Sequence, residues 1–475
     1  MPAVKLPLWV RALDAAAIAG LLLTTFVFLF GGFTVRVSLT PLRVHSTGRL
    51  LFIAAALLAI RHAAHPSTPL YGRLAVWLRG RDERPAGNAA AFALSTRLAI
   101  LFIGYMAVVT IGVNKLTTGF ELSPDKLFNL PARFDAGWYG GIALEGYYFG
   151  GDFTHQQNIA FFPAFPMLMR AAGYPIGAYG PGMPRELRVA RLLWGGVVIS
   201  LIAFAWAGAY LWRLARDTIG EPRAWDAVAL LAAYPFAVFF SAPYTESLFL
   251  LGSLAAVYHF RRDEWGRAGA WGLLVGLTRP NGFFLSLVLA ALIAERVWRE
   301  RKNLSTSPRL NLYRSLASAA MPGVGMLAFS AYVYQLTGHL FGWARLHEAW
   351  GRSYSGLAPV ERAYGWITDE GLLHVIEGVP FDTLNSLGLI FTLIMLWPVF
   401  RRLGPALALF VIVNAVPPML AGGVLSMGRL TATLFPVFLA LAATAPPRIV
   451  TALVIAFAAG QGLAAALFFT WRPLF

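Results

Sequence analysis

The chain has 475 residues, of which 58% are hydrophobic and only 13% are charged. Soluble domains carry about 25% charged residues and disordered chains are poor in apolar residues, so the composition excludes both classes. Because the sequence contains no cysteine, disulfide scaffolds, thiolate zinc sites, iron–sulfur clusters and cysteine nucleophiles are excluded as well. The net charge of +16 is typical of a membrane protein whose cytoplasmic loops collect Lys and Arg, and we expect no nucleic-acid partner.

Long uncharged apolar runs recur along the whole chain. The longer runs are 15–35, 98–114, 192–212, 227–245, 315–344, 383–400, 403–428, 430–447 and 449–471. Shorter runs are 50–60, 247–260, 268–278 and 280–294. Since a membrane-spanning helix needs about 20 apolar residues, these runs predict an all-α polytopic membrane protein with about 13 transmembrane helices.

The basic residues predict the orientation and the organisation of the chain. Lys5 and Arg11 precede the first run, which no cleavage motif follows, so we expect an uncleaved first span with a cytoplasmic N-terminus. Alternating sides from there puts the arginine-rich segments between spans on the inside, as the positive-inside rule requires. We divide the chain into a two-span hairpin (1–65), a cytoplasmic linker (66–94) and a transmembrane core (95–475).

Two long loops on the predicted outer side are the main candidates for function. They cover residues 115–188 and 337–382, and both are rich in Trp, Tyr, Phe and Gly. Loops of this length in a compact protein are usually functional or disordered. The aromatic content favours packed structure, and we expect short interfacial helices in both loops.

Two carboxylates at the outer side are candidates for chemistry. Asp135 follows Arg133 and precedes the aromatic pair Trp138 and Tyr139, so it is either a partly desolvated general base or a surface Asp paired with Arg133. Glu246 follows Pro243-Tyr244-Thr245. A helix N-terminus favours a negative charge there, and the alternative role is to orient an acceptor hydroxyl.

Two arginines interrupt apolar stretches at the same side. Arg279 lies in Thr278-Arg279-Pro280-Asn281-Gly282, and Arg429 follows Ser426-Met427-Gly428. An arginine within the membrane is costly and indicates function, and phosphate is a natural partner of a guanidinium. We predict that the two arginines bind one phosphate, with snorkelling at a helix end as the alternative.

Motifs for other chemistries are absent from the sequence. The eight histidines make no HxxxH or HExxH pair, and there is no Walker A, dinucleotide-binding or GxSxG motif. These absences argue against an ATP-driven transporter, a dehydrogenase and an α/β-hydrolase. We expect no metal and no nucleotide cofactor.

In this order along the chain, the motifs resemble a known family. They are Arg133-Phe134-Asp135 with Trp138-Tyr139 and Gly146-Tyr147, Ala160-Phe161-Phe162-Pro163, Pro243-Tyr244-Thr245-Glu246-Ser247 and Arg279-Pro280-Asn281-Gly282. From about residue 95 to 445, the chain resembles the PIG-V type of integral-membrane mannosyltransferase, which has the GT-C glycosyltransferase fold. Phe134 departs from the Arg-Trp-Asp that we expect in this family.

The resemblance implies a glycosyltransferase that moves a sugar, mannose in this family, from a polyprenyl-phosphate donor to a glycolipid or glycan acceptor. It implies an active site on the non-cytoplasmic face, and the composition suggests a bacterial cytoplasmic membrane. Asp135 occupies the position of the catalytic carboxylate. We expect one inverting displacement with Asp135 as general base and with Arg279 and Arg429 on the phosphate. The residues expected to bind the acceptor are Glu246, Arg133, Trp138, Tyr139 and His347.

Two other functions fit the same composition. A flippase for lipid-linked saccharides would also have many spans and buried arginines, but it should contain repeated broken helices, and the sequence has one clear broken pair. A membrane scaffold without catalysis would need neither Asp135 nor the intramembrane arginines.

Overall fold

The computed structural model describes residues 6–30, 33–37, 40–44, 46–66, 85–302, 311–378 and 380–474, and most of them are helical. The longer helices are α1 (Leu8–Phe30), α2 (Thr47–Ala64), α4 (Pro85–Thr110), α7 (Arg185–Ile219), α11 (Leu285–Lys302), α12 (Leu312–Thr337), α16 (Pro380–Leu403), α17 (Pro405–Gly422) and α20 (Pro447–Phe469). The shorter α-helices of the core are α8 (Glu221–Ala233), α9 (Glu246–Arg261), α10 (Trp265–Gly276), α18 (Met427–Thr431) and α19 (Phe435–Thr444), with 3-10 helices η2 (Pro235–Ser241) and η3 (Pro280–Phe284). The predicted all-α polytopic architecture is confirmed.

Fewer helices reach the length of a span than the sequence predicts. Eight described helices are long and apolar enough to cross a membrane, or nine if the bent pair α8–η2 counts as one. The predicted count of about 13 is not confirmed, because several apolar runs form short helices: α9 has 16 residues, α10 has 12 and α19 has 10. A helix rises 1.5 Å per residue, so each of these is shorter than the hydrocarbon core of about 30 Å.

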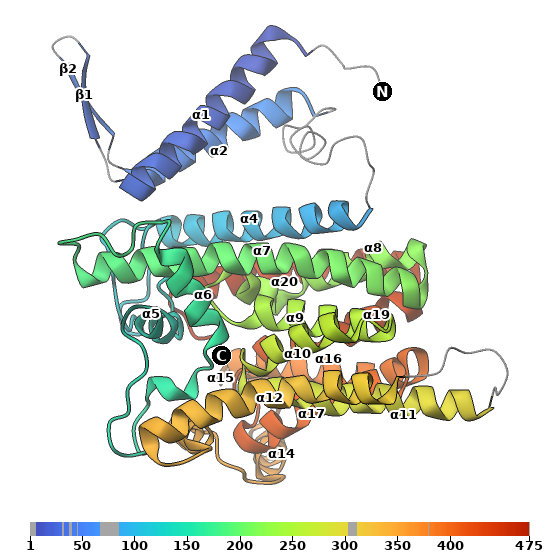
Figure 1. Cartoon of the computed structure of the whole chain (residues 1–475). Helices are drawn as coiled ribbons and strands as arrows, with labels where there is room; N and C mark the ends of the chain where they lie inside the picture. The colour runs from blue at the N-terminus through green and yellow to red at the C-terminus, as the bar shows by residue number, and fades with distance from the viewer. Residues whose placement is uncertain are drawn as a thin grey trace.

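The N-terminal pair of helices carries a small β-hairpin. Strands β1 (Phe33–Val37) and β2 (Thr40–Val44) pair antiparallel, with Phe33 opposite Val44. The predicted first span, 15–35, therefore ends earlier, at Phe30, because Thr-Val and Val-rich segments favour strands. Figure 1 shows α1 and α2 side by side next to α4. Helix α4 begins at Pro85, inside the expected linker 66–94, whose residues 67–84 lie outside the described part. The three-part division of the chain stays a prediction.

Both long loops contain the short helices that the sequence predicts. The first has α5 (Ala136–Glu145), η1 (Asn158–Ala160) and α6 (Ala164–Gly173). The second has α13 (Gly342–Arg345), η4 (Leu346–Trp350), α14 (Ala358–Glu370) and α15 (Leu372–Gly378). Helices α5 and α6 pack on α7, the long central helix that also contacts α4 and α9 (Figure 1). The first loop is thereby fixed to the helical core.

The core contains broken helices whose free backbone groups are satisfied by buried side chains. Helix α8 and η2 meet at an angle of 80°. Arg97 of α4, fully buried, donates to the carbonyls of Ala232 (2.5 Å) and Ala237 at this bend, and Gln461 of α20 donates to Tyr234 (2.8 Å). Since an unpaired carbonyl in an apolar interior is costly, these polar residues stabilise the bend.

The predicted break at Arg279 is present between α10 and α11. Helix α10 ends at Gly276, Arg279 is extended (φ −151°), and η3 starts at Pro280. Two glycines allow the close approach of the broken segments. A Cβ at Gly276 would lie 1.9 Å from the carbonyl oxygen of Pro322 on α12, and one at Gly282 would lie 2.1 Å from that of Val275.

Substitution of the packed glycine should destabilise the fold. We expect Gly276→Ala to lower the free energy of unfolding by about 1–3 kcal/mol or more, since overpacking forces the backbone apart. Gly266→Ala in the same helix is the control, because a Cβ there meets nothing within 4 Å and alanine favours the helix. Thermal unfolding in detergent measures both, and equal melting temperatures would contradict the packing described for Gly276.

Candidate functional site

Five of the predicted site residues, Asp135, Tyr139, Arg279, His347 and Arg429, line one cavity of about 530 Å³ where the two long loops meet the broken helices. Four parts of the chain form its walls: the start of α5, the turn between η2 and α9, the break before η3, and the segment from α17 to α18. The second outer loop closes it. The polar residues that line the cavity are Asp135, Tyr139, Thr245, Thr278, Arg279, Asn281, His347, Arg352, Ser426 and Arg429.

Arg429 connects the two candidate carboxylates. Its Nη1 lies 2.6 Å from Oδ2 of Asp135, and its Nε donates to Oε1 of Glu246. Nη1 of Arg279 lies 3.4 Å from the same Glu246 oxygen. The sequence places these four residues in four separate segments, and the structure joins them in one ion network, which we call the Arg429 network (Asp135, Glu246, Arg279, Arg429).

Burial differs between the members of the Arg429 network. The Glu246 side chain is fully buried, those of Arg279 and Arg429 are 8% and 9% exposed, and that of Asp135 is 24% exposed. Oε2 of Glu246 and Nη1 of Arg279 are buried without a hydrogen-bond partner in the described part of the chain. Asp135 is thus the carboxylate that a ligand in the cavity reaches most easily, whereas Glu246 holds the arginines.

Two residues with strained backbone conformations lie close in sequence to members of the Arg429 network. Phe134, directly before Asp135, has φ +45°, and Ser426, at the start of α18, has φ +60°. Non-glycine residues with positive φ cost free energy and persist where the surroundings fix them. The ring of Phe134 packs on Trp471, with 4.6 Å between ring centroids, and this contact fixes the turn that presents Asp135.

Glu246 is held by its helix as well as by the arginines. It is the first residue of α9, where the helix dipole favours a negative charge. The preceding Tyr244 is buried, donates to the carbonyl of Arg133 (2.9 Å), and has its ring 4.6 Å from the guanidinium of Arg429. The expected helix-end position of Glu246 is confirmed, and it coincides with its place in the network.

Arg133 does not enter the cavity. It is fully buried and donates to the carbonyls of Phe469 (2.7 Å), Asn129 (2.8 Å) and Ala132 (2.7 Å). The alternative of an Asp135–Arg133 surface pair is therefore wrong, because Asp135 pairs with Arg429. The predicted contact of Arg133 with an acceptor has no support from its position, which is that of a residue stabilising the C-terminal end of α20.

Of the predicted aromatic residues, Tyr139 forms part of the cavity wall together with His347, whereas Trp138 packs behind the wall. Tyr139 lines the cavity, and burial raises its pKa to about 12, so its hydroxyl stays protonated. Trp138 packs on Phe161 and on Trp350 of the second loop, with 5.8 Å between ring centroids in both cases. These contacts bring the two outer loops together over the site.

His347 is neutral at physiological pH. It lines the cavity, and its Nε2 is buried without a partner among the described residues. Burial, and to a smaller extent the charge of Arg352, lower its pKa from 6.5 to about 4. A neutral imidazole with an open nitrogen is able to form a hydrogen bond with a substrate hydroxyl.

Arg352 is the charged residue of the cavity that the predicted site does not include, since the sequence offers it only as one of several weaker candidates among the loop cations. It lies in the second loop with other cations such as Arg345 and Arg362, and the sequence does not distinguish it from them. Its position depends on the docking of the loop, where the amide of Ser355 donates to the carbonyl of Leu420 on α17 (3.1 Å). The Gly422-Gly423 pair at the end of α17 has no side chains of its own, and this feature of the sequence indicates that the side chain of another residue packs across it.

Metal ligands are not grouped at this site. Within the described ranges, no three His, Asp or Glu side chains come close enough to hold a metal ion. Both cavity carboxylates bind Arg429 instead. Cofactor and metal independence stays a prediction.

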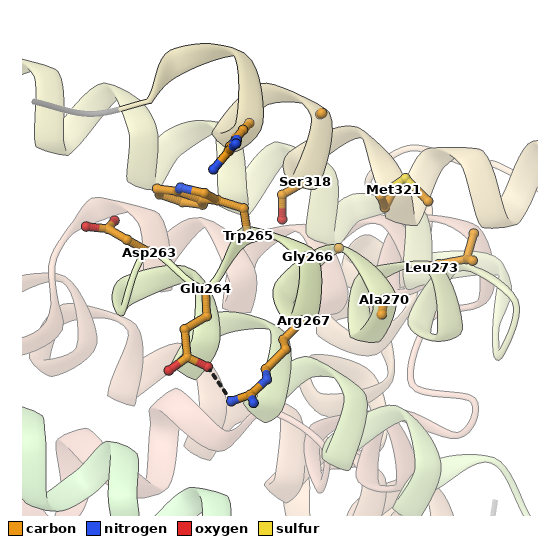
Figure 2. A pocket seen from close by; sticks show the side chains of 12 residues that line it. Asp263, Glu264, Trp265, Gly266, Arg267, Ala270, Leu273, Ser318 and Met321 are labelled. Carbon is orange, nitrogen blue, oxygen red and sulfur yellow. Dashed lines mark hydrogen bonds and ion pairs between the residues drawn. The ribbon is translucent and has the colours of Figure 1, made fainter.

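A second, larger cavity of about 1000 Å³ lies between α10 and α12. Figure 2 shows its lining, in which Glu264 pairs with Arg267 (2.9 Å) at one edge and Ala270, Leu273 and Met321 line the rest. Its acids Asp263 and Glu264 pair with exposed arginines. None of the predicted site residues line this cavity, so the candidate site is the smaller one.

Removing the charge of Glu246 should destabilise the protein. Glu246→Gln removes the negative charge that neutralises the buried guanidinium groups of Arg279 and Arg429. Breaking a buried ion pair costs about 3–5 kcal/mol of stability. The control is Glu145→Gln, since Glu145 is 53% exposed in its pair with Arg185 and an exposed pair contributes about 0–1 kcal/mol. Thermal unfolding in detergent compares them, and equal losses would show that Glu246 is not structurally coupled to the arginines.

The lowered pKa of His347 predicts a pH-dependent term in stability. Between pH 6.5 and about 4 the unfolded chain protonates this histidine and the folded chain does not, so lowering the pH through this window favours the unfolded state. His347→Gln removes that term, and we expect its melting temperature to fall less than that of the wild type from pH 7 to pH 4.5. Parallel melting curves against pH would mean that His347 titrates normally. His374→Gln, at an exposed position, is the control.

Comparisons with known proteins agree with the motifs. Residues 121–338 match the family model described as mannosyltransferase (PIG-V). Two curated relatives are both named GPI mannosyltransferase 2. The one from Drosophila melanogaster is 25% identical over 218 residues, which is 42% of each chain, and the one from Drosophila pseudoobscura pseudoobscura is 24% identical over 113 residues, or 24% of each chain. The matches therefore span less than half the length of these relatives. No solved structure matches the chain. The predicted resemblance to the PIG-V mannosyltransferase family is confirmed over residues 121–338.

Proposed function

We propose that this integral membrane protein is a glycosyltransferase that moves mannose from a polyprenyl-phosphate donor to a lipid-linked or glycan acceptor. The observation that carries the proposal is the Arg429 network, in which a partly exposed carboxylate and two buried guanidinium groups line one cavity. The family match supports the sugar and the type of reaction. The printed names of the relatives support mannosyl transfer, and the membrane-anchored acceptor is extended to this chain by similarity.

The proposed reaction is a single displacement at C1 of the donor sugar. The acceptor oxygen forms the new bond to C1 while the bond from C1 to the phosphate oxygen breaks. Asp135 accepts the proton of the acceptor hydroxyl as general base, and the electron pair of the broken bond remains on the phosphate. One displacement inverts the configuration at C1. The network offers guanidinium groups where the negative charge of the leaving phosphate grows.

Donor binding also prepares the base in this proposal. Without ligand, Nη1 of Arg429 is engaged by Asp135 at 2.6 Å. A phosphate in the cavity competes for this guanidinium, and Glu246 keeps Arg429 in place through its Nε. Asp135 is then released to bind the acceptor hydroxyl. The carboxylate acts as base only when the donor is present.

The walls of the cavity suit the other parts of the substrates. Phe161, Phe162, Phe283 and Phe284 line it together with Pro417 and Pro418, and such apolar surface fits the prenyl chain and the faces of sugar rings. Tyr139 and neutral His347 are the proposed hydrogen-bonding partners of the acceptor hydroxyls.

We place the site on the non-cytoplasmic face of the membrane, with the N-terminus in the cytoplasm. The support is the distribution of charge along α9 and α11, whose ends far from the cavity carry Arg261, Arg262, Arg296 and Arg299, in agreement with the positive-inside rule. A bacterial membrane and the GT-C assignment of the fold rest on composition and resemblance.

Neutralising Asp135 should abolish transfer. We expect Asp135→Asn to reduce the rate by at least about 100-fold, the usual contribution of a positioned general base. The assay follows label from polyprenyl phosphate mannose into a covalent product in membranes that contain the protein. Asp152→Asn is the control, because Asp152 is an exposed residue of the same loop and binds Thr154.

Three results would contradict the proposal. Retained transfer by Asp135→Asn would remove this residue from the base role. Label that crosses the membrane without entering a covalent product would favour the transporter. Transfer by the wild type with retained configuration at C1 would exclude the single displacement.

A further inference from the structure

We propose that Arg352, which the family match does not cover, binds the phosphate of the lipid-linked donor and makes the cavity selective for an anionic ligand. This inference rests on the proposed function and deepens it. Residues 121–338 match the family model, and Arg352 lies beyond them in the second outer loop. It nevertheless lines the same cavity as Asp135 and Arg279.

Within the described part of the chain, Arg352 has no carboxylate as an ion-pair partner, although Asp135 is close enough to interact with its charge. Asp135 and Glu246 balance Arg279 and Arg429, with which they form the ion pairs described above. No carboxylate in the described part of the chain lies within 4 Å of Arg352, and its guanidinium makes one hydrogen bond, to the carbonyl of Leu425 (3.2 Å). The cavity therefore has one excess positive charge, which matches the single negative charge of a sugar phosphodiester.

The structure holds Arg352 firmly in the cavity wall. Its amide donates to the carbonyl of His347 (3.0 Å), after a turn at Gly351 with φ +69°. Its side chain crosses Gly422, where a Cβ would lie only 3.3 Å from Cγ of Arg352. A guanidinium has five N–H donors in a fixed fork, so the hydrogen bond to Leu425 leaves several of them for a phosphate.

Electrostatics favour an anion next to Arg352. Burial, with a smaller effect from nearby Arg429, lowers the pKa of Arg352 to about 10. The group is still charged at neutral pH, but its charge is poorly solvated. A phosphate would compensate this charge with a bidentate, charge-assisted contact. Arg429 is shared between two carboxylates, so the free donors of Arg352 and Arg279 are the first that an entering phosphate meets.

The experiment separates the phosphate contact from a structural role of Arg352. Purified protein is titrated with polyprenyl phosphate and with the uncharged polyprenol of the same length, and steady-state transfer gives KM for the donor and kcat. For Arg352→Gln we expect at least a tenfold loss of the preference for polyprenyl phosphate over polyprenol, the size that removal of a charge-assisted hydrogen bond gives. KM for the donor should rise by a similar factor, more than kcat falls.

Two further variants complete the design. Arg352→Lys keeps the charge and should recover most of the preference. Arg345→Gln should behave as the wild type, because Arg345 is exposed in the same loop and packs on Phe153 outside the cavity. If Arg352→Gln does not fold, Arg352→Lys against Arg352→Met, which keeps the length of the stem, gives the same comparison.

The outcomes distinguish this inference from the proposed function. An equal loss of affinity for polyprenyl phosphate and polyprenol would show that Arg352 only shapes the loop, and would overturn the inference. A fall in kcat with unchanged preference would do the same. If the wild type binds polyprenyl phosphate with an Arg352-dependent preference but transfers no sugar, the phosphate site stands and the proposed transferase fails.

Discussion

The shared guanidinium of Arg429 is the interaction on which the site depends. It lies between Asp135 of the first outer loop and Glu246 at the start of α9, and so joins segments that are 294 and 183 residues away along the chain. A buried arginine without carboxylates, or a buried glutamate without arginines, would carry a large desolvation cost. Each buried charge therefore needs the opposite charge of its partner. The fold provides these partners by bringing the starts of α5, α9 and α18 together at one point.

Four buried arginines of the core beyond the N-terminal pair of helices form two groups with different partners. Arg97 and Arg133 donate only to neutral acceptors, the carbonyls of Ala232 and Phe469 among them, and they stabilise the ends of broken or irregular helices. Arg279 and Arg429 contact carboxylates beside a cavity. Irregular backbone inside a membrane protein is tolerated where it is buried in protein or lines a cavity. The first group satisfies carbonyls at the bend between α8 and η2 and at the end of α20, whereas the second group faces an open, charged space and is therefore the candidate for function.

The sequence was sufficient to predict the helical membrane fold and the break at Arg279, and it singled out Asp135, Glu246 and Arg429, which the structure joins in one network, because charges in an apolar chain are few and each requires an explanation. It was not sufficient for Arg133 and Arg352. Arg133 precedes Asp135 by two residues, but the positive φ of Phe134 turns the chain between them, and such a turn is fixed by tertiary contacts with Trp471. Arg352 reaches the cavity because its loop docks on α17, and the Gly422-Gly423 pair there does not identify which loop side chain packs across it. The predicted number of spans is not confirmed, since apolar composition does not determine where a helix ends or bends.

The site extends beyond the part of the chain that the family match covers. Asp135, Glu246 and Arg279 lie within residues 121–338, whereas His347, Arg352 and Arg429 follow them. Within residues 121–338, Arg279 is the cavity arginine that pairs with one of these carboxylates, at 3.4 Å from Glu246, and one arginine does not balance two carboxylates. The matched region therefore cannot form the site alone. It supplies Asp135, the proposed base, and the wall toward the first loop, and the C-terminal part supplies Arg429, which pairs with Asp135, and the loop that closes the cavity.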